Sequence, residues 1–454
     1  NTRDGRRGAL FVQHNLSTKP IVRGVAAACA LFAFGVRAHQ DVQAPTVNVI
    51  GHYETGVGTS DAASEGGVTA KRIETRPLLR TGEIIELVPG MIVTQHSGDG
   101  KANQYFLRGY NLDHGTDLAI TVDGMPVNMR THGHGQGYAD LNFLIPELIG
   151  SVHIRKGPYF ADEGDFASAG AVHVNLLDTI GKSMALASAG SFGYRRGLGV
   201  ASSNAGNGHL LIAGEAATYD GPWDNPDKVR KLNAMVRYSE GTAADGLSLT
   251  GMAYANRWNA TDQVPLRAIA SGEIGLYGAL DPSDGGRADR FSLSGRWTRS
   301  DKEGSSKASF YAIKSSLDLY NNFTFFLSDP VNGDQFRQHD DRVVAGANAS
   351  QTFNGFLAGL LVQTEIGVQS RYDDIKVSLS NTLQRRFLAG TRDDRVKEAS
   401  AGLFVQSTLH WTPWLRTTAG YRGDVYTATV DSLLMPANSG RAGAAIGSPK
   451  FGMV

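Results

Sequence analysis

The chain has 454 residues, which is enough for two or more domains. Lysine plus arginine and aspartate plus glutamate are equal at 44 each, so no net charge directs the protein to nucleic acid. Hydrophobic residues make up 41% of the chain, and beyond the N-terminal segment no apolar run reaches the roughly 18 residues of a membrane helix. This composition fits a soluble protein or a membrane β-barrel, whose alternating strands leave a weak hydropathy signal.

The N-terminal segment is typical of a secretory signal. Basic residues precede an apolar run from Gly24 to Val36, and small residues lead to Ala38. This order predicts a signal peptide over residues 1–38, and the alternative is a buried helix. The single cysteine, Cys29, lies inside the apolar run, so cleavage would leave no thiol for a disulfide or for thiolate chemistry.

Residues 39–70 are rich in Gly, Ser, Thr and Ala, a composition typical of a flexible tether. Within them, Thr46, Val47, Asn48, Val49 and Ile50 form a lone β-prone patch. The residues leave two interpretations open. The patch is either the first strand of the next domain or a segment that a partner binds by strand addition.

Residues 71–180 predict a compact domain with a mixed sheet. An amphipathic helix is expected over Arg76 to Leu87, stopped by Pro89 and Gly90. Four β-type runs follow, each next to a turn signal, with one helical insertion expected from Asp140 to Ile149. The runs are 104–110, 118–127, 148–158 and 164–174.

One loop of this domain carries the strongest ligand hypothesis. It contains Arg130, His132, His134, Gln136 and Tyr138, which offer hydrogen-bond donors and an aromatic face. Two imidazoles separated by one glycine suit a transition metal, but no spacing supplies a third ligand, so no metal site is assigned. The alternative is a tight glycine turn with the histidines bonded to the backbone. Asn103, from the polar loop 95–103, joins the candidate substrate contacts.

From about Ser183 the chain alternates apolar and polar residues, and period two indicates strands. A soluble sandwich would show the same alternation. The connections discriminate, because short turns near 204–208, 240–246, 299–306, 353–355 and 411–414 alternate with long loops over 219–228, 258–289, 317–340 and 373–394. Short turns on one rim and long loops on the other are what an outer-membrane barrel requires.

About eleven strands are expected before Val454, whereas plugged transporter barrels need about twenty-two. We therefore expect a fragment that contains about the first half of a barrel. No catalytic motif is present: the sequence has no Gly-x-Ser-x-Gly, no His-Glu-x-x-His and no phosphate loop. Neither an enzyme activity nor a cofactor is predicted.

The ordered series Phe106-Leu-Arg-Gly109, Val122-Asp-Gly-Met-Pro-Val127, Val152-His-Ile-Arg-Lys-Gly-Pro158 and Ala169-Gly-Ala-Val-His-Val174 resembles the plug domain of TonB-dependent outer-membrane receptors. The resemblance implies an α+β plug over residues 71–180, followed by an antiparallel transmembrane β-barrel from residue 181. It also implies that residues 46–50 are the TonB box and that the plug loops touch the substrate.

In function, the resemblance implies a monomeric active transporter in the outer membrane of a Gram-negative cell. Its partners would be TonB, the surrounding lipid and a scarce substrate, with an iron–siderophore or other metal chelate as the default. The alternative is a passive porin or an adhesin without energy coupling, which would need no separate folded domain ahead of the strands.

Overall fold

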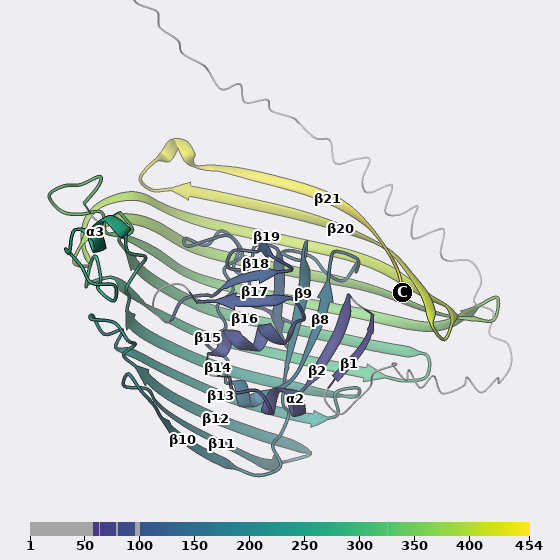
Figure 1. The fold of residues 1–454 in the computed structure, drawn as a ribbon. Coiled ribbons are helices and arrows are strands. Elements are labelled where there is room, and N and C mark those ends of the chain that lie inside the picture. Colours follow the sequence, from purple (N-terminus) through teal and green to yellow (C-terminus); the bar gives the residue numbers. More distant parts are fainter. Residues whose placement is uncertain (1–57, 63, 79, 96–99, 325) are drawn as a thin grey trace, which may run out of the picture. The chain divides into compact units, whose positions relative to one another are not determined.

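The computed structural model describes residues 58–62, 64–78, 80–95, 100–324 and 326–454 (Figure 1). The predicted signal peptide and the predicted TonB box therefore lie outside the described residues. The described chain forms an N-terminal domain, residues 58–180, and a strand domain, residues 184–454.

The N-terminal domain contains two small sheets. A six-stranded sheet has the order β1-β2-β8-β9-β6-β7, in which β6 and β9 run parallel, and a three-stranded sheet has the order β3-β4-β5. The elements are β1 (Gly58–Ala62), β2 (Glu65–Thr69), α2 (Ala70–Glu74), η1 (Thr81–Leu87), β3 (Met91–Thr94), β4 (Gln104–Leu107), β5 (Tyr110–Asn111), β6 (Leu118–Val122), β7 (Met125–Pro126), η2 (Pro146–Leu148), β8 (Ile149–Lys156) and β9 (Gly170–Leu176). The β1–β2 hairpin lies within the segment predicted as tether.

The central strands of this sheet bury apolar side chains against the short helical segments. Ile120 on β6, Val152 on β8 and Val172 on β9 are all 0% exposed, as are Ile84 and Ile85 of η1. Burial of an Ile or Val side chain contributes about 1.5–3 kcal/mol. The predicted mixed sheet is thus present, but it contains three of the four β-type runs, because the run 104–110 lies in the three-stranded sheet.

Both predicted helices are shorter than expected. The sequence indicated a helix over 76–87, but the structure has α2 up to Glu74 and the 3₁₀ helix η1 from Thr81, with Pro77 between them. Proline disfavours helical geometry at the residue before it, which separates the two segments. The insertion at 140–149 contains only the one-turn η2, and Pro146 is its first residue. In the described part of the chain, no helix combines the length and apolarity needed to cross a bilayer.

The strand domain is one antiparallel sheet of twelve strands, each paired with its neighbours in the sequence (Figure 1). About eleven were predicted. The sheet is open, since β10 and β21 each have one neighbour in it. A short helix α3 (Leu266–Ala270) and the 3₁₀ turn η3 (Pro436–Asn438) lie in its connections. The strands are β10 (Met184–Ala189), β11 (Arg195–Ala205), β12 (Gly208–Tyr219), β13 (Val229–Gly241), β14 (Gly246–Asn259), β15 (Gly285–Ser300), β16 (Gly304–Asn321), β17 (Phe336–Leu357), β18 (Leu360–Leu383), β19 (Arg386–Thr412), β20 (Leu415–Ser432) and β21 (Gly440–Met453).

In a soluble sandwich apolar side chains are buried between the sheets, whereas here large apolar side chains are exposed on one face of the sheet. On β13, Leu232 is 58% exposed and Val236 is 49% exposed, whereas Arg237 is 0% exposed. Large apolar side chains therefore lie on the open face, whereas the face that contacts the N-terminal domain buries charged side chains together with apolar ones such as Met235. This arrangement is the lipid-out, polar-in pattern of a membrane barrel.

The connections at one end of the sheet are all short, as predicted, but two of the predicted connections are placed differently in the structure. Successive connections of an antiparallel sheet alternate between its ends, and those at one end are all short: 206–207, 242–245, 301–303, 358–359 and 413–414. The turn predicted at 353–355 falls instead at Ala358 and Gly359. The long loop predicted over 373–394 is wrong, because β18 and β19 continue through it and turn at Gln384 and Arg385. Charged residues such as Asp373 and Lys376 lie within extended strands there, and their polarity made the segment resemble a loop.

Candidate ligand site

The histidine loop, residues 128–138, is closed by its own backbone. The Met129 N–H donates to the Tyr138 carbonyl at 3.0 Å, and the Gly137 N–H donates to the Met129 carbonyl at 2.9 Å. Gly137 has φ +78°, and a Cβ there would lie 2.8 Å from the Gly115 carbonyl oxygen. Only glycine fits this positive φ beside another backbone. The glycines predicted to make a tight turn therefore do so at this position.

A single buried amide fixes the base of the loop. The Asn128 Nδ2 donates to the carbonyls of Gly115 and Leu118 at 2.9 and 2.8 Å, and its Oδ1 accepts the Ile120 N–H at 2.7 Å. Asn128 is 2% exposed, so these bonds replace water on both sides of the amide. The loop is thereby tied to the start of β6.

The two predicted histidines are packed rather than free. The His132 ring stacks on the Tyr138 ring with centroids 4.1 Å apart, and its Nδ1 accepts the His134 N–H at 3.1 Å. The His134 Nδ1 lies 2.8 Å from the Gln338 Oε1 on β17. Burial lowers the pKa of His132 to about 4 and the pKa of His134 to about 3. Both rings are thus neutral at pH 7.

The remaining predicted residues point to different places. The Arg130 Nε donates to the Asp165 Oδ2 at 2.7 Å and its Nη2 donates to the Ser400 Oγ at 2.8 Å, away from the histidines. Gln136 is exposed and its side-chain oxygen accepts the Thr131 N–H at 2.7 Å. Asn103 is half-buried, and its carbonyl lies 3.0 Å from the His114 ring nitrogen.

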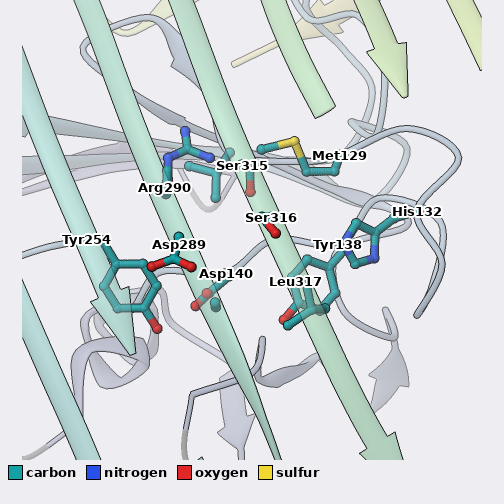
Figure 2. Close-up of a pocket in the computed structure, with 12 residues that line it drawn as sticks. Met129, His132, Tyr138, Asp140, Tyr254, Asp289, Arg290, Ser315, Ser316 and Leu317 are labelled. Carbon is teal, nitrogen blue, oxygen red and sulfur yellow. The ribbon is translucent and has the colours of Figure 1, made fainter. Parts of the chain in front are cut away.

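A small pocket with a mixed polar and apolar lining lies between the histidine loop and three strands (Figure 2). It is partly open to solvent. Of the six predicted substrate contacts, His132 and Tyr138 line it, and the other four do not. The full lining is Val127, Met129, His132, Tyr138 and Asp140 of the N-terminal domain, Tyr254 of β14, Ala288, Asp289 and Arg290 of β15, and Ser315, Ser316 and Leu317 of β16.

The strand residues of this pocket were missed by the sequence reasoning. Tyr254 is 3% exposed and Arg290 is 6% exposed, and they lie on adjacent strands, where Tyr254 pairs in register with Arg290. The alternation of β14 and β15 assigns both side chains to the inner face. It gives no information on which loop of the N-terminal domain meets them.

Histidines and carboxylates do not converge on a common point for a metal. Across residues 58–454, apart from the undescribed positions, no group of three or more His, Cys, Asp or Glu side chains is arranged to hold an ion. In this structure the two imidazoles take part in ring stacking and in hydrogen bonds.

Buried and half-buried arginines of the strand domain bind the N-terminal domain. The Arg237 Nη1 donates to the Asp123 Oδ2 and its Nη2 to the Asp178 Oδ1, both at 2.6 Å. The Arg371 Nη1 donates to the Asn128 carbonyl at 2.9 Å, and the Arg196 Nη1 donates to the Glu147 Oε1 at 2.6 Å. The two domains are therefore joined by directed, charge-assisted bonds along several strands.

A folded domain held against one face of an open antiparallel sheet defines the class of architecture: a plug domain followed by barrel strands. Residues 59–171 match the family model described as TonB-dependent Receptor Plug Domain. The chain therefore carries a TonB-dependent receptor plug domain followed by a partial β-barrel, and the recognition made from the sequence motifs is confirmed.

Comparison with known proteins gives the same class. The chain is 27% identical over 159 residues to the Ferrienterobactin receptor of Escherichia coli (strain K12), a match that covers 32% of this chain and 21% of that one. Among solved structures, the ferric citrate transporter FecA superposes with a TM-score of 0.69 at 10% identity, over 86% of this chain and 60% of that chain. The Copper transporter OprC superposes with a TM-score of 0.65 at 18% identity, over 87% and 60%. The chain thus spans about a fifth of the curated relative and 60% of these solved structures.

Proposed function

We propose that the protein acts in the outer membrane as an active transporter that takes up an iron chelate or another metal chelate and is energised through TonB. The observation that carries this proposal is the plug domain with its histidine loop, which arginines of the strands hold against the polar face of the sheet. A passive pore has no use for a folded domain bonded inside its strands. The similar proteins, a receptor and two transporters, support the same class of activity.

In the proposed mechanism, substrate binds to plug loops and strand residues from outside the cell. Binding biases the segment around Thr46 to Ile50 toward the periplasm, where TonB adds a strand to it. A pull driven by the inner-membrane proton gradient then displaces the plug. The plug loops, together with Tyr254 and Arg290, supply the contacts to the chelate.

The decisive experiment removes the backbone donors that strand addition needs. In the full-length protein, V47P/V49P deletes two N–H groups from the patch, and V47I/V49I is the matched control that keeps them. Uptake of radioactive iron(III) enterobactin and iron(III) citrate is measured in cells, and binding is measured on purified protein. We expect the proline variant to lose uptake and keep binding, as would deletion of Pro45 to Gly51. Uptake that survives both changes would show a passive porin, and binding without any uptake in the wild type would favour an adhesin.

A further inference from the structure

Arg290 differs from every other buried arginine in the described residues. Five arginines there are less than 9% exposed: Arg237, Arg290, Arg342, Arg371 and Arg422. The other four each have a carboxylate oxygen within 3 Å of the guanidinium. Arg290 forms no such ion pair within the described parts of the chain.

The contacts that Arg290 does make are weak for a buried cation. Its guanidinium carbon lies 4.4 Å from the centre of the Phe143 ring, and its Nη2 lies 3.8 Å from the Met125 sulfur. Its Nε has no hydrogen-bond partner. A cation–π contact contributes a fraction of what a paired carboxylate does, and the charge of Asp140 acts on Arg290 only from beyond ion-pair distance. Such a group in a native structure calls for a ligand or a functional reason.

A second unsatisfied group lies beside it. Asn256 on β14 is 1% exposed, and neither its side-chain nitrogen nor its oxygen has a partner. It pairs in register with Ala288, which lines the pocket two residues before Arg290. The hydroxyl-bearing Ser315 and Ser316 line the same pocket on β16 (Figure 2). The pocket therefore combines a guanidinium, hydroxyls and a neighbouring free amide.

We infer that this pocket binds a carboxylate group of the transported chelate, and that Arg290 is the residue that recognises it. This inference rests on the proposed function and names the substrate class: a carboxylate-bearing metal chelate. A guanidinium binds a planar carboxylate through two parallel N–H donors. Asp140 and Asp289 also line the pocket, and they would repel a doubly charged phosphate more strongly than a singly charged carboxylate. The pocket is small and partly open, so it suits a single functional group at the edge of a chelate and not the whole molecule.

The test compares two iron chelates on the purified full-length protein. Iron(III) citrate presents carboxylates, and iron(III) enterobactin presents catecholates only. R290Q removes the charge, and R290K keeps the charge but loses the paired donors. We expect R290Q to raise the dissociation constant for iron(III) citrate by about tenfold or more, as loss of a charge-assisted bond implies, and R290K to raise it by less. Affinity for iron(III) enterobactin should stay within about twofold.

R299Q is the matched control, because Arg299 lies on the same strand, is exposed and does not line the pocket. Its citrate affinity should equal that of the wild type. Thermal melting of each variant separates loss of binding from loss of folding, and R290K tests the inference even if R290Q unfolds. Unchanged citrate affinity in R290Q, or a wild type that binds only the catecholate, would overturn the inference and leave the proposed function standing. A wild type that binds neither chelate would overturn both.

Discussion

His132 and His134 show how packing sets the charge of a side chain. Both rings are neutral at neutral pH because burial outweighs the attraction of His132 to Asp340, whose oxygen lies 3.9 Å from its Nε2. Arg342, His114 and Lys101 oppose a positive charge on one or both rings. The loop is therefore closed only while these imidazoles stay unprotonated.

Acid should open the histidine loop. In an open loop each imidazole would titrate near pH 6.5, whereas the closed loop lowers the pKa values to about 4 and about 3. Above about pH 6.5 the imidazoles are neutral in both the open and the closed loop, so pH has no effect on the balance between them. Below pH 6.5 the open loop binds protons and the closed loop does not, so the population of the open loop rises as the pH falls to about 4. We expect hydrogen exchange of residues 130–138, corrected for intrinsic rates, to accelerate between pH 7 and pH 5. The variant H132N/H134N keeps a hydrogen-bond donor and acceptor at each position but cannot take up a proton, so it should lose that acceleration. An equal response in the wild type and the variant would show that the two histidines do not cause it.

The sequence predicted only part of the pocket, for a physical reason. His132 and Tyr138 stand out because a loop rich in glycine and imidazole is unusual locally. Arg290 and Tyr254 lie more than a hundred residues further along the chain. Strand alternation assigns their face, but the height at which a strand residue meets the plug depends on the packing of two domains, which no local pattern encodes.

At the scale of elements, the β14–β15 loop, residues 260–284, covers part of the plug. Lys101 of the plug lies 4.0 Å from the Asp262 carboxylate of this loop, and both side chains are almost fully buried. Burial, with the nearby Asp262 charge, raises the pKa of Asp284 to about 9. The Asp284 carboxyl is therefore protonated in the closed loop at neutral pH.

Alkali should loosen this loop, the opposite sign to the histidine effect. An exposed Asp284 titrates near its ordinary value of 3.8, so the stability that its protonated form contributes is fully present only below that pH and is lost as pH rises toward about 9. We expect hydrogen exchange of residues 260–284 to accelerate from pH 7 to pH 9.5 beyond the intrinsic change. D284N, a neutral isostere, should flatten this dependence, and E273Q, which alters an exposed acid on the same loop, should keep it.

Elements were easier to predict than their limits. Alternation correctly identified the strands, because a one-residue shift would exchange the lipid-facing and plug-facing side chains. The helix expected over 76–87 was wrong in its first half, because the apolar spacing was counted across Pro77. The loop expected over 373–394 was wrong because charged residues also belong in strands that extend beyond an apolar belt.

For the molecule as a whole, the ion pairs between domains decide how firmly the plug is held. R237A would leave the buried Asp123 with only Arg296 nearby, and breaking one partner of a buried pair costs about 3–5 kcal/mol. We expect the plug to unfold at a lower urea concentration, as followed by exchange of residues in β6 and β9. R230A removes an exposed arginine from the same strand and should change the unfolding free energy by less than about 0.5 kcal/mol. Equal losses in the two variants would show that the pair does not hold the plug.

The strand order of the plug sheet also sets the order in which its strands would bear a mechanical load. A force that enters the chain at Gly58 meets β1 at the outer margin, then β2, and only later β8 and β9. The histidine loop follows β7, at the far margin of the same sheet. Traction from the N-terminal side would thus separate β1 and β2 while β6 and β7 were still paired, so that loss of the near margin and movement of the histidine loop would be two events separated in time.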